Sequence, residues 1–192
     1  MNKIDLRQGD CLELMKDLPD KSIDLILCDL PYGTTACKWD NIIPFEPLWE
    51  QYNRIIKDKG AIVLFGSEPF SSKLRLSNLK NYKYDWIWYK RKAGNIFLAK
   101  FQPMKVHENI SVFSNNTHLF YPIKTKRDKV KTSRQYSTSK NFTSKLLDKT
   151  ISYSDRNPIS ILDFSNASQV NRLHSTQKPV PLLEYLIKTY TL

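Results

Sequence analysis

The chain has 192 residues, a formal net charge of +11, and 41% hydrophobic residues. This length and apolar content allow a buried core, which excludes global disorder and favours one domain, or one domain with a small insert. No apolar run approaches the roughly 18 residues of a membrane span, and the polar N-terminus lacks the apolar stretch of a signal peptide. The three cysteines form no CxxC pair. We therefore expect no disulfide framework, no metal site and a reduced, soluble, cytoplasmic protein.

The positive charge is unevenly distributed along the chain. Residues 1–72 carry 8 basic and 12 acidic residues, residues 73–105 carry 9 and 1, and residues 106–192 carry 13 and 6. An acidic head followed by a basic remainder suits a catalytic platform beside a nucleic-acid groove. The alternative is a basic surface that serves only solubility.

Strand and helix patterns alternate in the first part of the chain, which predicts an α/β fold. In chain order we expect a strand at 4–7, a helix over 10–18 with Asp10 as its N-cap, a strand at 23–28, a helix over 46–57 and a strand at 61–65. The nearly continuous apolar run at 23–28 predicts a central parallel strand buried on both faces. Further strands are expected at 84–89 and 109–113, and a helix over 182–190.

The composition changes near Ser114. Residues 115–150 carry 9 basic and 2 acidic residues with little periodicity, so they form either an inserted recognition module or a basic loop. His118 has no ligand partner nearby in the sequence and is expected on the surface. Two basic clusters are candidates for DNA phosphate contacts, with solvated charge runs as the alternative. They are Lys90, Arg91 and Lys92, and Lys124, Lys126, Arg127, Lys129, Lys131 and Arg134.

The segment with the strongest chemical character is Asp29-Leu30-Pro31-Tyr32, directly after the strand predicted at 23–28. Open α/β sheets bind ligands beyond the carboxyl ends of their strands. Asp29 offers a charged acceptor, Pro31 a carbonyl on a stiff backbone, and Tyr32 a flat ring. Together they suit a planar heterocycle that carries an exocyclic amino group. An ordinary turn is the alternative.

These residues resemble the (D/N/S)-P-P-Y motif of the amino-group DNA methyltransferases, with Leu30 in place of the first proline. Three further segments resemble the subclass in which that motif comes first, and the four matches follow the family's order. They are Gly9-Asp10-Cys11, His107-Glu108 with Ile110 to Phe113, and His174-Ser175-Thr176-Gln177-Lys178-Pro179.

The resemblance implies a partial Rossmann-like, S-adenosylmethionine-dependent methyltransferase sheet with an inserted basic recognition region. It implies a catalytic half at 1–114, a recognition insert at 115–170, and a loop and helix at 171–192. Asp29, Pro31 and Tyr32 would be catalytic, and Lys178 would pair with the cofactor's carboxylate. The expected cofactor-binding residues are Asp10, Cys11, His174, Thr176, Gln177 and Lys178. For Asp10 and Cys11, a helix cap and a small core residue are the alternatives.

The resemblance further implies double-stranded DNA as substrate and, because the motif begins with Asp, adenine N6 rather than cytosine N4 as the target. The family's glycine-rich F-x-G-x-G cofactor loop has no counterpart, since the chain has five glycines and none follows Gly94. We therefore expect a truncated or split enzyme, with a second polypeptide supplying the remainder. An inactive DNA-binding remnant is one alternative and an N4-cytosine DNA methyltransferase is the second; a restriction endonuclease would be a further partner.

Overall fold

The computed structural model describes residues 4–35, 37–38, 40–138, 144–166 and 176–191. The chain divides into two units. The main unit comprises Met1–Tyr121 and Ser160–Leu192, and the second unit comprises Pro122–Ile159. Among the described residues, no helix has the length and apolar character needed to cross a membrane.

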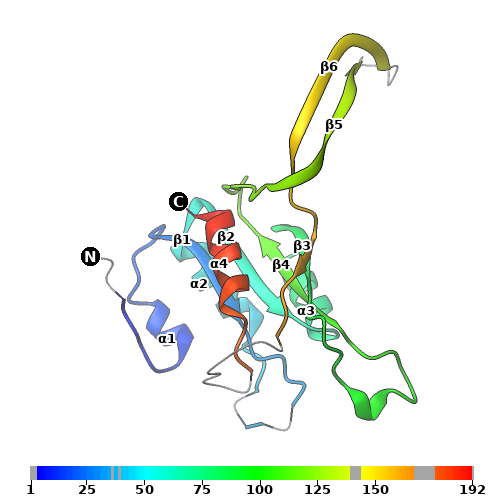
Figure 1. The fold of residues 1–192 in the computed structure, drawn as a ribbon. Coiled ribbons are helices and arrows are strands. Elements are labelled where there is room, and N and C mark those ends of the chain that lie inside the picture. The colour runs from blue at the N-terminus through cyan, green and yellow to red at the C-terminus, as the bar shows by residue number, and fades with distance from the viewer. Residues whose placement is uncertain (1–3, 36, 39, 139–143, 167–175, 192) are drawn as a thin grey trace. The chain divides into compact units, whose positions relative to one another are not determined.

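A five-stranded mixed sheet forms the centre of the main unit, in the order β1-β2-β4-β3-β7 (Figure 1). Its strands are β1 (Ile23–Asp29), β2 (Ile56–Gly66), β3 (Tyr82–Tyr89), β4 (His107–Phe113) and β7 (Ile161–Asp163). β1 is parallel to β2, and β3 is parallel to β7. β4 lies between β2 and β3 and is antiparallel to both.

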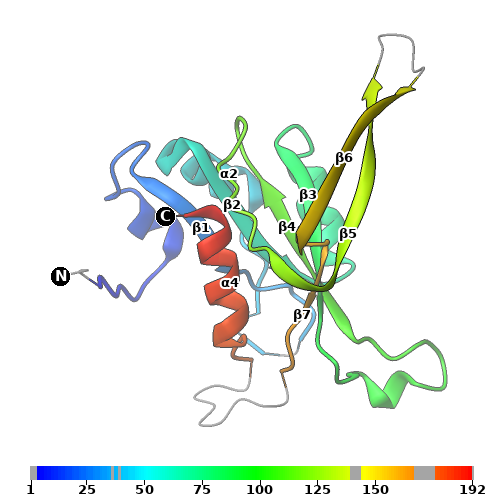
Figure 2. The ribbon, with the colours of Figure 1, turned by 45° about the horizontal axis from the view of Figure 1, so that its top comes forward.

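Helices pack on both faces of this sheet because successive side chains of β2 point to opposite faces. Ile62 and Leu64 belong to one core cluster with α2 (Phe45–Ile55) and α3 (Phe70–Ser77). Val63 and Phe65 belong to a second cluster with α4 (Val180–Tyr190). Figure 2 shows α4 lying along the sheet. The short α1 (Cys11–Met15) adds Met15 to the first cluster.

A group of buried polar side chains joins α4 to β3. Trp86 donates its indole N–H to the Tyr190 hydroxyl at 2.7 Å, and the Tyr84 hydroxyl lies 3.0 Å from the same oxygen. Nε2 of His118 lies 3.0 Å from the Tyr84 hydroxyl. The expectation that His118 is a surface residue is wrong, because its ring is half-buried against Tyr84 and Tyr190.

Two further sequence expectations are corrected by the structure. Residues 4–7 form no strand, since Ile4 and Leu6 are exposed and no strand in the described part of the chain pairs with them. β1 is half-buried and lies at an edge of the five-stranded sheet, with β2 as its only partner among the described residues. The sheet as a whole is mixed, because β4 runs antiparallel to both of its neighbours.

The second unit is built around an antiparallel hairpin of β5 (Thr125–Thr138) and β6 (Ser144–Arg156). It lies within the segment 115–170 that the sequence predicts as an insert. Part of the segment 115–150 is thus paired strand rather than loop. Residues 115–121 and 160–166 belong to the main unit.

Candidate active site

A cavity of about 660 Å³ opens in the main unit, beyond the carboxyl end of β1. Its walls come from parts of the chain that are far apart in sequence. They include the turn Asp29–Tyr32, the end of β3 at Trp88, the start of β4 at Glu108, and the segment Thr176–Lys178 before α4. This volume lies within the range of small-molecule sites, about 300–1,000 Å³.

Asp29 is held by two donors inside this cavity. The Tyr32 hydroxyl donates to Oδ1 at 2.8 Å, and Lys178 Nζ donates to Oδ2 at 2.7 Å. The two carboxylate oxygens offer about four acceptor positions, so Asp29 can still accept hydrogen bonds from a ligand. Burial and the carboxylates of Asp29 and Glu108 raise the pKa of Tyr32 well above its ordinary value, so its hydroxyl keeps its proton.

The Tyr32 ring stacks on Phe70 of α3. The two ring centroids are 5.1 Å apart and the planes differ by 25°. Stacking on Phe70 covers one face of Tyr32 and fixes the direction of the other. Leu30, which replaces the family's first proline, is buried in the core cluster with α2 and α3. The departure from the motif therefore adds an apolar anchor beneath the turn.

Charges alternate along one wall of the cavity. Lys178 Nζ contacts Asp29 and lies 3.5 Å from Glu108 Oε2, while Glu108 Oε1 accepts from Lys90 Nζ at 3.0 Å. The Lys178 ammonium also lies 5.3 Å from the centroid of the Phe65 ring. Because each carboxylate has a cation beside it, two acidic groups can share a partly buried site.

Asp40 orders the loop that follows Tyr32. Its carboxylate accepts the backbone N–H groups of Gly33, Thr34 and Thr35 at 2.7–2.9 Å, and the Thr35 hydroxyl at 2.8 Å. Gly33 has φ +65°, and an added Cβ would lie 2.9 Å from Ile42, so glycine suits this position. Burial raises the pKa of Asp40, but the hydrogen bonds from Thr35 and the loop backbone outweigh it and lower the pKa to about 2. Thr34, Thr35 and Asp40 all line the cavity.

Comparison with known proteins assigns the chain to a family. A profile of the family described as "N6_N4_Mtase: DNA methylase" matches residues 23–192, which is most of the chain. The chain belongs to this DNA methylase family.

Individual relatives of this DNA methylase chain are more distant. The type II methyltransferase M.HpaI of Haemophilus parainfluenzae is 26% identical over 194 residues, which cover 93% of this chain and 57% of the relative. The chain thus spans little more than half of that protein. The solved PvuII DNA methyltransferase, described as cytosine-N4-specific, superposes with a TM-score of 0.62 at 14% identity, over 96% of this chain and 69% of the other. A complex of M1.HpyAVI with SAM superposes with a TM-score of 0.58 at 19% identity, over 97% of this chain and 76% of the other. These two structures support the methyltransferase fold.

The residues that the sequence suggests for cofactor binding are only partly gathered here. Thr176, Gln177 and Lys178 line the cavity, and His174 lies outside the described residues. Asp10 and Cys11 do not line it. Asp10 caps α1 through the N–H of Leu12 at 2.8 Å, and Cys11 is exposed at the start of that helix. Asp10 therefore has the helix-capping role that the sequence left as its alternative. Cys11 is exposed, so it is not the small core residue that was the alternative for it.

Several cavity residues were missed by sequence reasoning. Glu108 and Trp88 lie on strands whose aromatic and apolar patterns gave no sign of a site, although Glu108 is part of a family-like segment. Asn166 and Asp40 come from irregular loops. Asn166 Oδ1 and Glu108 Oε2 are buried and accept no hydrogen bond from any described residue. The cavity therefore contains acceptors that a bound ligand could satisfy.

The basic residues proposed for DNA contact differ in their surroundings. Lys90 is mostly buried beside Glu108, and Arg91 pairs with Asp163 at 2.6 Å, while Lys92 is exposed. In the hairpin unit, Lys126 pairs with Asp155 at 2.9 Å, and Arg127 donates to the Asp155 carbonyl. The exposed lysines of this cluster in the hairpin unit are Lys124, Lys126, Lys129 and Lys131, whereas the side chain of Arg134 lies outside the described residues.

Proposed function

We propose that the protein is an S-adenosylmethionine-dependent DNA methyltransferase that methylates an exocyclic amino group, and that its target is adenine N6. Membership of the DNA methylase family supports the class of reaction. The observation that carries the proposal is the convergence of Asp29, Pro31 and Tyr32 on one cavity. Asp at the head of the motif favours N6 of adenine over N4 of cytosine by the family resemblance.

The chemical difficulty is that an exocyclic amino nitrogen is a poor nucleophile, because its lone pair is delocalised into the ring. Asp29 and the Pro31 carbonyl would accept its two N–H groups and so favour a tetrahedral nitrogen with a localised lone pair. When bound, S-adenosylmethionine would supply the methyl group: the nitrogen lone pair would form the new C–N bond while the electrons of the broken C–S bond stay on sulfur. Asp29 then accepts the proton that the nitrogen loses. Holding the reacting atoms in this geometry supplies much of the rate.

The target base must leave the duplex to reach the cavity, at a cost of a few kcal/mol. Tyr32 would offset part of this cost by stacking on the base, which is worth about 1–3 kcal/mol, and the stacking of one face of its ring on Phe70 supports this role. Double-stranded DNA is therefore the proposed substrate. The exposed lysines of the hairpin unit would contribute phosphate contacts, which position DNA without reading its sequence.

The described residues fit part of an S-adenosylmethionine site. Lys178 would hold the cofactor's carboxylate, with Thr176 and Gln177 beside it, while the buried oxygens of Asn166 and Glu108 would accept from ligand N–H or O–H groups. The cofactor supplies a methyl group activated by a sulfonium sulfur, so no metal is required. Because Lys178 now contacts Asp29, binding would divide its charge between the two carboxylates.

The test is methylation of DNA by the full chain with S-adenosylmethionine, read by mass spectrometry of the nucleosides. N6-methyladenine is expected with the wild-type chain and should be absent with Asp29→Ala, which should still bind DNA. N4-methylcytosine as the only product would overturn the adenine assignment. DNA binding without any product, and without heat on titration with millimolar S-adenosylmethionine, would support the rival reading of a DNA-binding protein that does not turn over.

A further inference from the structure

Between β3 and β4 the chain makes an excursion whose foot adjoins the cavity. The Lys90 N–H donates to the Val106 carbonyl at 2.8 Å, and the Gly94 N–H donates to the Lys105 carbonyl at 2.8 Å. The cavity-lining residues Trp88 and Glu108 are each two positions from this closure. Figures 1 and 2 both show the excursion projecting from the sheet where β3 ends and β4 begins.

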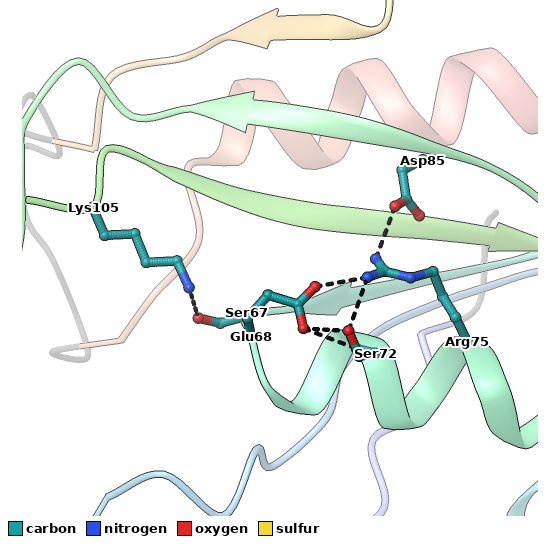
Figure 3. A network of polar contacts seen from close by, with 6 residues as sticks. All are labelled: Ser67, Glu68, Ser72, Arg75, Asp85 and Lys105. Carbon is teal, nitrogen blue, oxygen red and sulfur yellow. Dashed lines mark hydrogen bonds and ion pairs between the residues drawn. The ribbon is translucent and has the colours of Figure 1, made fainter. Parts of the chain in front are cut away.

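Side chains tie the foot of the excursion to the sheet. Lys105 Nζ donates to the Ser67 hydroxyl just beyond β2, as Figure 3 shows. Arg91 pairs with Asp163 of β7, and Lys90 pairs with Glu108 of β4. In Figure 3, the neighbouring Glu68 is in turn held by Arg75 of α3. Contacts to β2, β4 and β7 thus fix where the excursion leaves the cavity rim.

The far part of the excursion carries exposed apolar side chains, whereas a loop that faces solvent usually carries polar ones. Phe97 and Phe101 are 94% and 84% exposed, although each carries a full aromatic ring. We call the exposed apolar group here the apolar tip; it consists of Ile96, Phe97, Leu98, Phe101 and Met104. A contiguous exposed apolar group marks an interaction site rather than a scattered surface residue.

The charge around the apolar tip indicates its partner. Residues 90–105 include five basic and no acidic residues, and Lys92 and Lys100 are exposed beside the tip. Two copies of this segment would repel each other, whereas DNA phosphates would attract it. Proteins that distort DNA use this combination, with basic residues on the backbone and Phe, Leu, Ile or Met inserted between bases.

We propose that the apolar tip inserts into the target duplex beside the extruded nucleotide and fills the space that the base leaves. The inference rests on the proposed function, because only an enzyme that takes its base out of the stack creates that space. The position of the foot carries the argument. A base held in the cavity and a tip anchored at the cavity rim would act on the same stretch of DNA.

The test compares the affinity of the full chain for two short duplexes of one sequence, one fully paired and one with a stable abasic analogue. The wild-type chain is expected to bind the abasic duplex about tenfold more tightly, or about 1.4 kcal/mol. In the double variant Phe97→Ser/Phe101→Ser this preference should fall below about twofold, with the salt dependence for the paired duplex unchanged. The matched control, Leu76→Ser/Leu79→Ser, removes two exposed apolar side chains at the end of α3 and should keep the preference.

The other outcomes separate this inference from the proposed function. DNA binding without an abasic preference, or a preference that survives in the double variant, overturns the insertion while leaving the methyltransferase proposal in place. A change of oligomeric state in the double variant, seen by sedimentation, would identify a second copy as the partner and overturn it also. Loss of folding in the double variant would mean that the tip is buried in solution, with the same consequence. Absence of DNA binding by the wild-type chain overturns both proposals.

Discussion

Lys178 Nζ lies 2.7 Å from Asp29 Oδ2, although the two residues are separated by most of the chain. This ion pair joins the end of β1 to the segment before α4. Both residues line the cavity, so the pair brings two family-like motifs together there. The pair also shows that the residue proposed for catalysis is electrostatically compensated by the residue proposed for the cofactor.

We expect Lys178→Met to lower the free energy of unfolding by about 1–2 kcal/mol, between the values for exposed and buried ion pairs. The side chains are 12% and 36% exposed, and the substitution leaves Asp29 and Glu108 together without their shared cation. Urea denaturation measures the change. The control is Lys188→Met, whose exposed pair with Glu184 on α4 should contribute little. Equal effects of the two variants would contradict the role given to the Lys178 pair.

Tyr32 should act mainly through its ring. Tyr32→Phe removes the hydrogen bond to Asp29 and keeps the surface that stacks on Phe70, so we expect a fall in kcat/KM for methyl transfer that corresponds to about 1 kcal/mol at most. Tyr32→Ala removes the stacking face and should cost about 1–3 kcal/mol. Steady-state methylation kinetics measure both. Because Tyr32→Ala removes the hydroxyl as well, equal losses in the two variants would show that the hydroxyl, and not the ring, is the essential group.

Asp40 should make the loop after the motif sensitive to acid. Its folded-state pKa of about 2 lies below the value of about 3.9 for an unfolded Asp, so its stabilisation is complete above about pH 4 and is lost as pH falls toward about 2. Asp40→Asn should lower the free energy of unfolding by about 1–3 kcal/mol at neutral pH, and the difference from wild type should shrink below about pH 4. Urea denaturation across pH tests this. Asp58→Asn, at an exposed ion pair with Lys21, should show neither effect.

The Tyr190 hydroxyl should stabilise the docking of α4. Tyr190→Phe leaves the buried indole N–H of Trp86 without its acceptor, which should lower the free energy of unfolding by about 1–3 kcal/mol. Thermal or urea unfolding measures the change. Tyr89→Phe provides a control at the exposed end of the same strand, β3, and should have little effect. An unchanged stability in Tyr190→Phe would exclude this hydroxyl as a contact that stabilises the docking of α4.

Lys90 and Lys92 of the first basic cluster should differ in their effects on DNA binding. Lys92 is exposed, so Lys92→Gln should reduce the slope of log affinity against log salt by about 1 if it contacts a phosphate. Lys90 is mostly buried beside Glu108, so Lys90→Gln should lower stability and leave the slope unchanged. Fluorescence anisotropy at several salt concentrations distinguishes them. A reduced slope in Lys90→Gln alone would reverse this assignment.

The local pattern of apolar residues was sufficient to predict where several strands and helices of the main unit lie. The apolar run at 23–28 lies within β1, and the periodic segments at 46–57 and 182–190 overlap α2 and α4. The same pattern gave wrong predictions where pairing with a neighbouring strand decides the structure. Residues 4–7 have strand-like alternation without a pairing strand, and β1 has the composition of a central strand at an edge position. α3 was not predicted, since its polar residues obscure the apolar face formed by Phe70 and Leu74.

The sequence by itself determined the chemistry that the turn Asp29–Tyr32 can offer, and family motifs supplied the segments expected around it, because both depend on the identity and order of neighbouring residues. Only the tertiary structure decided which distant groups surround that turn. Packing of β4 between β2 and β3 places Glu108 beside Lys178, and Asp40 folds back onto the loop backbone. Such contacts follow from how strands pair and helices cover the sheet, which no spacing along a single chain specifies.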